Sequence, residues 1–102
     1  MIFLKKYPTQ NGLVIALCDE ELIGKVLRGG RTVIDLARYA SFYKGDLMSE
    51  EQAASAIGEG DVYSLNVVGE RSVRVVIDLG IATEESVLRV GGVPFVQIYK
   101  LV

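Results

Sequence analysis

Short apolar runs separated by turn residues give this chain the pattern of a strand-rich domain. The clearest run covers residues 13–18, six apolar residues in succession, which is typical of a strand buried on both faces. Asn11-Gly12, between this run and an apolar segment at the start of the chain, is a strong signal for a β-hairpin. The same reading predicts strands over residues 1–7, 13–18, 32–39, 61–68, 87–90 and 95–101.

Apolar residues at helical spacing predict three helices, over residues 20–27, 50–57 and 70–79. Asp19 is expected to cap the first of them, and Ser49 with Gln52 matches the capping box that begins the second. The third segment also has strand propensity, but the crossover needed after Gly69 favours a helix. Residues 32–39 are ambiguous in the same way, and there β-branched residues favour a strand that continues toward Phe42 and Tyr43.

The predicted order of elements, a hairpin followed by alternating helices and strands, indicates a mixed sheet with helices packed on it. The chain has 102 residues, half of them hydrophobic, which suits one domain with its own core. We therefore expect a single compact α+β domain over residues 1–102, with a mixed β-sheet and about three packed α-helices.

Charge and composition remove several classes of function. Eleven basic and thirteen acidic residues give a net charge of −2, which argues against a globally basic nucleic-acid binder but allows a local basic patch. Without histidine there is no imidazole base and no histidine-containing metal site, and one cysteine allows no disulfide or thiolate cluster. We therefore assign no catalytic residue, no metal and no cofactor, and we do not favour an enzyme.

The compartment is predicted from the single cysteine and from the lengths of the apolar runs. Cys18, at the end of an apolar run, is expected to be a buried, unreactive thiol, which fits a reducing compartment. Lys5 and Lys6 interrupt the apolar start of the chain, and no run approaches the ~20 residues needed to span a bilayer. We expect a cytoplasmic protein with no membrane partner.

Four motifs occur in a characteristic order along the chain. They are residues 16–25 (ALCDEELIGK), 45–51 (GDLMSEE), 66–71 (NVVGER) and 91–94 (GGVP). Together they resemble the archaeal family known as domain of unknown function 424, over about residues 3–99. The resemblance implies no established activity, but it supports the expected fold and compartment. Members of that family tend to carry histidine directly after the last motif, where this chain has Phe95, so we expect no catalytic role for this bend.

The first candidate site is the turn from a strand into a helix at residues 66–71. Free backbone N–H groups and the positive end of a helix dipole suit an anion there. The residues assigned to this anion or phosphate site are Asn66, Gly69, Arg71 and Arg74. A negative charge at Glu70 and the lack of a P-loop motif leave an ordinary helix start as the alternative.

The second candidate is a segment in which aromatic and basic residues alternate. Rings stack on unpaired bases while cations meet phosphates, which is the chemistry of single-stranded nucleic-acid binding. The residues assigned to it are Arg38, Tyr39, Phe42, Tyr43 and Lys44. Ordinary packing of these rings in the core is the alternative.

Two weaker candidates are basic and glycine clusters near the turns and ends of the chain. Lys5 and Lys6, followed by Tyr7, would form a patch with Lys100 if the first and last strands were neighbours, although lysines on edge strands more often prevent unwanted pairing. The glycine pairs at 29–30 and 91–92 allow positive φ or a close backbone approach to a ligand, as they would in ordinary turns.

The leading functional hypothesis is a cytoplasmic, non-catalytic module that binds RNA or a ribonucleoprotein of the translation type, with no DNA expected. It requires Arg38, Lys44 and Arg71 to share one face. One alternative is a subunit of a protein assembly, a homo-oligomer or a complex with another protein, that pairs through an exposed strand over residues 95–102. The other alternative is a binder of a small anion or nucleotide at residues 66–71.

Overall fold

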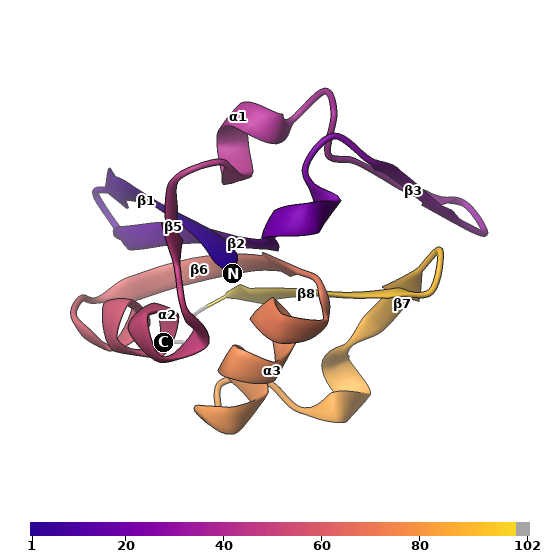
Figure 1. The fold of residues 1–102 in the computed structure, drawn as a ribbon. Coiled ribbons are helices and arrows are strands. Elements are labelled where there is room, and N and C mark those ends of the chain that lie inside the picture. Colours follow the sequence, from indigo (N-terminus) through magenta and orange to yellow (C-terminus); the bar gives the residue numbers. More distant parts are fainter. Residues whose placement is uncertain (100–102) are drawn as a thin grey trace.

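The structure, a computed structural model, describes residues 1–99 and arranges their strands in two sheets (Figure 1). The strands are β1 (Ile2–Thr9), β2 (Gly12–Asp19), β3 (Val26–Gly29), β4 (Thr32–Asp35), β5 (Asp46–Met48), β6 (Val62–Val68), β7 (Leu88–Val90) and β8 (Val93–Tyr99). The α-helices are α1 (Ala40–Tyr43), α2 (Glu50–Gly58) and α3 (Glu70–Asp78), and short 3-10 turns are η1 (Glu20–Leu22) and η2 (Glu84–Ser86).

Six strands make one mixed sheet in the order β5-β1-β2-β6-β8-β7, and β3 pairs with β4 in a separate hairpin. β1 and β2 are antiparallel up to the pair Thr9–Gly12, so the hairpin predicted from Asn11-Gly12 is confirmed. β2 runs parallel to β6, and β8 is antiparallel to β6. The predicted α+β class with a mixed sheet and three helices is therefore confirmed for the described residues.

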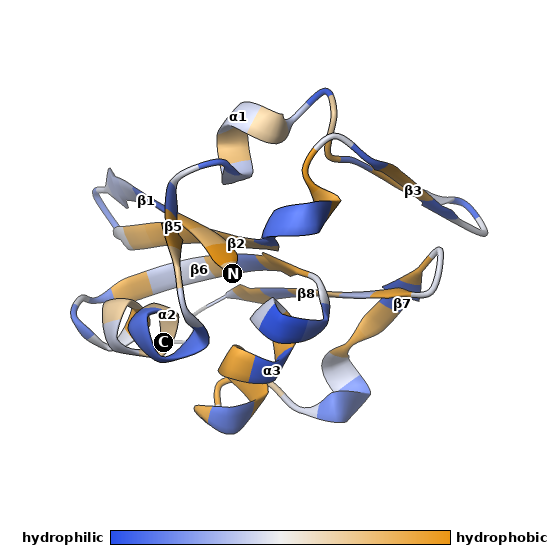
Figure 2. Ribbon diagram, viewed as in Figure 1, coloured by the Kyte–Doolittle hydropathy of each residue, from blue (hydrophilic) through white to orange (hydrophobic). Residues whose placement is uncertain are grey.

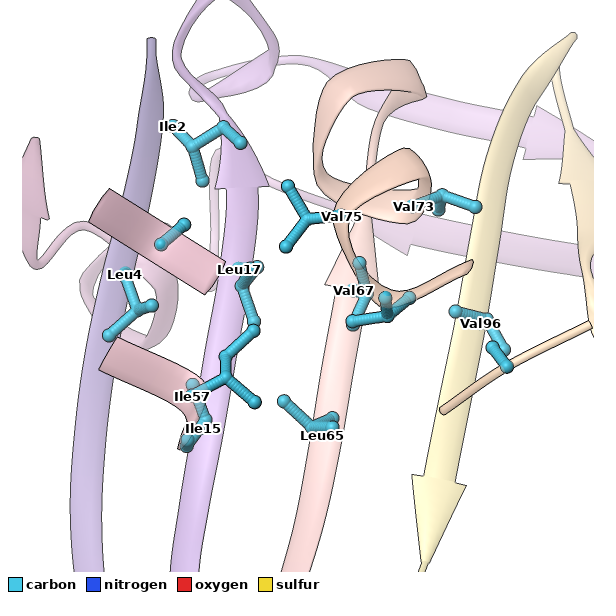
Figure 3. Close-up of a cluster of buried hydrophobic side chains, with 13 residues drawn as sticks. Ile2, Leu4, Ile15, Leu17, Ile57, Leu65, Val67, Val73, Val75 and Val96 are labelled. Atoms are coloured by element: carbon cyan, nitrogen blue, oxygen red, sulfur yellow. The ribbon is translucent and has the colours of Figure 1, made fainter. Parts of the chain in front are cut away.

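The two long helices cover one face of the sheet (Figures 1 and 3). α2 begins with the predicted capping box, in which Ser49 Oγ accepts a hydrogen bond from the backbone N–H of Gln52 and Gln52 Oε1 accepts one from that of Ser49. Valines of α3 pack with alternate residues of the central strands. The buried core between helices and sheet includes Ile2, Leu4, Ile15, Leu17, Ile57, Leu65, Val67, Val73, Val75, Val76 and Val96.

The opposite face of the sheet carries a thinner layer, made of η1, α1 and the β3–β4 hairpin (Figure 1). A second core lies between this layer and the sheet, and it comprises Ala16, Cys18, Leu22, Leu27, Leu36, Tyr43, Val68 and Val90. Cys18 is fully buried there, as predicted. Burial, together with the neighbouring Asp19 and Glu21 carboxylates, raises the pKa of the Cys18 thiol to about 12.

The helix predicted over residues 20–27 is wrong. The chain makes only the 3-10 turn η1 and then enters β3, where Leu27 pairs with Ile34 and packs into the second core. The spacing of the apolar residues fits a helix and also fits a hairpin with a two-residue turn at Gly30 and Arg31. Cross-strand pairing of β3 with β4 stabilises the hairpin instead of the helix. Asp19 makes no side-chain cap for η1.

The strand predicted over 32–39 ends early, and its predicted continuation is a helix. β4 stops at Asp35, whose Oδ1 accepts hydrogen bonds from the backbone N–H groups of Ala37 and Arg38, an Asx turn that bends the chain into α1. Phe42 and Tyr43 therefore lie in α1. The short strand β5 was not predicted. The last predicted strand extended to residue 101, and its final two residues lie outside the described residues.

Candidate aromatic and amide pocket

A cavity of about 710 Å³ opens on the face of the sheet that α1 and the hairpin cover only in part. Its floor is formed by β6 and β8, and its walls by α1, the turn before it and β4. The lining residues are Val33, Ile34, Asp35, Arg38, Tyr39, Phe42, Tyr43, Asn66, Phe95 and Gln97. The pocket thus joins four residues of the predicted aromatic and basic segment to one residue of the predicted anion site.

Stacked rings fix α1 against the sheet. The rings of Tyr7 and Phe42 are stacked at 5.2 Å with 10° between their planes, and Tyr43 meets Phe42 edge-on at 5.0 Å. The hydroxyl of Tyr7 donates to the carbonyl of Phe42 at 2.8 Å. Lys5 lies over the Tyr7 ring and donates to the carbonyl of Ser41 at 2.8 Å. These contacts make the aromatic wall of the pocket a preformed surface.

The predicted stacking residues differ in their exposure. Tyr39 is 55% exposed, and the guanidinium of Arg38 lies 5.5 Å from the centre of its ring. Phe42 is half-buried, whereas Tyr43 belongs to the core and burial raises the pKa of its hydroxyl to about 12. Lys44 is exposed just after α1 and does not line the pocket. Among the predicted stacking residues, Tyr39 and Phe42 are therefore the rings that a ligand can reach.

The floor of the pocket carries a pair of amide side chains. Asn66 and Gln97 face each other across β6 and β8, and Gln97 Nε2 donates to Asn66 Oδ1 at 2.8 Å. Within residues 1–99 the Asn66 amide N–H groups and the Gln97 Oε1 atom make no further hydrogen bond. The floor therefore offers both donors and an acceptor beside the rings.

Apart from the 3-10 turn η1, which carries Glu20 and Glu21, the layer that contains the pocket is locally basic. Residues 23–45 contain five basic side chains, and Asp35 is the single acidic residue among them. The basic residues are Lys25, Arg28, Arg31, Arg38 and Lys44. None of these five forms an ion pair with a described residue, whereas Lys6, Arg71 and Arg89 all do. The Asp35 carboxylate is engaged by its own turn, so this layer presents a net positive surface.

The predicted anion site at the start of α3 is filled by a carboxylate of the protein itself. Asp19, 2% exposed at the end of β2, accepts hydrogen bonds from the backbone N–H of Arg71 at 3.0 Å and of Ser72 at 2.9 Å, and from Ser72 Oγ at 2.7 Å. Gly69 has φ +112°, and a Cβ there would collide with the Asp19 carboxylate. Asp19 therefore supplies the negative charge that the helix terminus favours.

The remaining residues of that candidate site lie apart from one another. Arg71 pairs with Glu21 at 2.6 Å, and this contact raises the Arg71 pKa. Arg74 is exposed on α3, on the opposite side of the sheet from α1 (Figure 1). Arg71 lies at the start of the same helix with its guanidinium on Glu21, and neither Arg71 nor Lys44 lines the pocket with Arg38. The pocket therefore does not bring together the three cations of the sequence-based RNA hypothesis. Asn66 alone faces the pocket.

The weaker candidates have structural roles in the described residues. β2 and β6 separate β1 from β8, so the first and last strands are not neighbours, and Lys100 lies outside the described residues. Lys6 pairs with Glu59 at 3.5 Å. The glycine pairs bring the hairpin onto the β7–β8 turn, because a Cβ on Gly29 would lie 2.9 Å from the backbone nitrogen of Gly91. The close backbone approach predicted for the glycine pairs is therefore present, between the β3–β4 hairpin and the β7–β8 turn.

The last strand is only partly an edge strand. β8 has β6 on one side, and on the other side β7 pairs with it from Val93 to Phe95. A cavity of about 550 Å³ near its end is lined by aliphatic side chains, including Ile57, Leu79 and Ile81, together with Tyr63, Tyr99, Asp61 and Ser64. Residues 1–99 contain no cluster of metal-ligating side chains and no helix long and apolar enough to cross a membrane.

Two residues that line the pocket, Phe95 and Gln97, were not predicted to take part in a site. Both lie in the strand predicted over residues 95–101, directly after the glycine and proline bend. The alternation of Phe95, Gln97 and Tyr99 on one face of β8 was visible in the sequence. Only the pairing of β8 with β6 places Gln97 beside Asn66.

Comparisons with known proteins extend this description. A family model described as "Protein of unknown function (DUF424)" matches residues 7–101. The fold is similar to that in the crystal structure of an uncharacterized conserved protein from Methanopyrus kandleri, with a TM-score of 0.81 and 34% sequence identity, covering 96% of this chain and 90% of that chain. No curated protein matches the sequence. Neither description names an activity.

Proposed function

The chain belongs to the DUF424 family, and we propose that it is a non-catalytic module that binds single-stranded RNA by taking an unpaired base into the aromatic and amide pocket. One observation carries the proposal: a single 710 Å³ cavity is lined by accessible aromatic rings, by two side-chain amides and by the Arg38 guanidinium, which forms no ion pair with a described residue. The binding surface is this pocket and the basic layer around it. It does not include Arg71.

The rings supply the non-specific part of binding. A base can stack on the exposed ring of Tyr39, next to the Arg38 guanidinium, or against the edge of the Phe42 and Tyr7 stack. Stacking of a base on an aromatic side chain is worth about 1–3 kcal/mol and accepts any base. A rigid wall reduces the entropy lost on binding.

The amide floor supplies polar contacts to the edge of the base. Asn66 retains donors and Gln97 retains an acceptor after their mutual hydrogen bond. Every base presents donors or acceptors on its Watson–Crick edge, and these are available for binding only when the base is unpaired. The floor therefore favours a single strand over a duplex at the pocket.

Local charge supports a polyanionic ligand in spite of the acidic pI. The layer over residues 23–45 has five basic residues and one acidic residue, whereas the rest of the chain has six basic and twelve acidic residues. This separation directs phosphates toward the pocket and away from the helical face of the sheet. The absence of histidine and the high pKa of the buried Cys18 thiol leave neither an imidazole base nor a reactive thiol for catalysis.

Fluorescence anisotropy with a labelled ten-nucleotide RNA of mixed sequence tests the proposal. We expect a Kd that rises with salt, and Tyr39→Ala and Arg38→Ala should each weaken binding about tenfold. Arg74→Ala is the matched control, since Arg74 is an exposed arginine on the other face of the sheet. The proposal is overturned if the RNA does not bind, or if Arg38→Ala and Arg74→Ala have the same Kd.

A further inference from the structure

We infer that the preferred RNA is a stem that carries an unpaired nucleotide, with the unpaired base in the pocket and the stem along the β3–β4 hairpin. This inference rests on the proposed function and adds the form of the RNA to it. The hairpin carries the argument, because β4 forms one wall of the pocket and the rest of the hairpin continues the basic surface away from it.

The hairpin is held firmly relative to the pocket. At its base, the backbone N–H of Gly24 donates to the carbonyl of Leu36 at 2.9 Å, and that of Leu36 donates to Lys25 at 2.8 Å. At its turn, Gly29 lies against the backbone of Gly91. Both ends are therefore anchored, and the outward face keeps a fixed position beside the pocket.

The exposed part of the hairpin offers cations and no rings. Lys25, Arg28 and Arg31 are exposed and form no ion pair with a described residue. The exposed apolar residues there are Val26 and Val33, which are aliphatic. Figure 2 shows that the far end of the hairpin is hydrophilic. This surface can contact phosphates and sugars but cannot stack bases.

A surface of this kind suits paired RNA better than a single strand. The bases of a single strand gain by stacking on rings, and the hairpin provides none. The bases of a duplex are already stacked, and the duplex presents its backbone and 2′-hydroxyls across a wide, shallow minor groove. Lys25 precedes β3, Arg28 lies within it and Arg31 lies in the turn of the hairpin, so the cations can follow a backbone beyond the pocket.

Three RNAs separate this inference from the proposed function. They are the ten-nucleotide single strand, a blunt duplex, and a stem of the same length that carries one unpaired nucleotide. We expect the stem with the unpaired nucleotide to bind about tenfold tighter than the single strand, because the hairpin would add two contacts between cations and phosphates. The blunt duplex should bind most weakly.

The double variant Arg28→Ala, Arg31→Ala assigns this gain to the hairpin. It should remove the tenfold preference for the stem and lower the salt slope for the stem by about 1.5, while the Kd for the single strand, whose base the pocket still holds, rises by less than the Kd for the stem. Arg74→Ala with Arg89→Ala is the control of equal charge, and thermal melts check that each variant is folded. Equal binding of stem and single strand, or equal effects of the two double variants, would overturn the inference but leave the proposed function standing. Failure of the single strand to bind would overturn the proposed function instead.

Discussion

Removal of the Asp19 carboxylate tests how the start of α3 is held. In Asp19→Ala, two backbone N–H groups and one hydroxyl lose the acceptor that they share in the buried space between β2 and α3. Hydrogen bonds to a charged group are worth about 1.5–3 kcal/mol each, and water that enters the vacated space would recover part of the loss. We expect the free energy of unfolding to fall by about 3–5 kcal/mol, a large share of the ~5–15 kcal/mol typical of a domain.

Urea unfolding followed by circular dichroism measures this loss. With a slope near ~1.5 kcal/mol per molar urea, the midpoint should fall by about 2 M or more while the slope stays constant. Glu21→Gln is the matched control, because it removes the neighbouring carboxylate that pairs with Arg71 at the surface. Surface ion pairs contribute little, so its midpoint should lie close to that of the parent protein.

An external carboxylate should partly replace the one that is lost. Formate fits the chemistry of the vacated position, and at ten times its Kd it would restore about 1.4 kcal/mol to Asp19→Ala. Sodium chloride at the same ionic strength should restore nothing, and formate should leave Glu21→Gln unchanged. If Asp19→Ala is no less stable than Glu21→Gln, or if chloride and formate act alike, the internal anion does not hold α3 as described.

The buried thiol of Cys18, the backbone at Gly69 and the surface carboxylate of Glu21 give three further predictions. Cys18 should resist thiol reagents at pH 8 until the protein unfolds, and rapid labelling of the native protein would refute this. The stability that the neutral buried thiol provides should be complete below pH 9 and should be lost as pH rises toward the raised pKa of about 12. Gly69→Ala should lower the free energy of unfolding, measured with urea, by at least about 2 kcal/mol, and by less when Asp19→Ala is also present. Additive losses in the double variant would show that the added Cβ does not collide with the Asp19 carboxylate. A backbone hydrogen bond and then Arg71 lower the pKa of Glu21. The ionised carboxylate therefore adds to the free energy of unfolding at pH values above the usual pKa of glutamate, and this addition is lost as pH falls through the lowered pKa. Parallel acid-unfolding curves for Glu21→Gln and the parent protein would contradict this prediction.

Elements with local signals were predicted well from the sequence. The capping box at Ser49 and the turn at Asn11-Gly12 both depend on residues close together in the chain, and both are present in the structure. Residues 20–27 were mispredicted because their apolar spacing fits a helix, while the cross-strand pairing of Leu27 with Ile34 stabilises a hairpin. Local propensity is a weak guide when a tertiary contact competes with it.

The candidate site depends on contacts that are distant in the sequence. The sequence predicts that Asp19 caps the segment that follows it, but its carboxylate binds first-turn N–H groups of α3 that lie 52 and 53 residues later. This contact depends on β2 lying beside β6. Asn66 was assigned to an anion site for its place before Gly69, yet strand alternation turns it toward the other face, where it meets Gln97. The sequence could identify the aromatic and basic segment, but strand order alone decides which polar groups lie beneath it.

Ring-proton chemical shifts of Tyr39 and Phe42 give the most direct test of the pocket as a binding site for an unpaired base. The ten-nucleotide RNA would be titrated into protein with labelled aromatic residues, and inorganic phosphate would be titrated in parallel. A base stacked in the pocket would move these ring signals and the side-chain amide signals of Asn66 and Gln97, while phosphate alone would leave them in place. Shifts confined to the start of α3, or no shifts at any RNA concentration, would contradict the account.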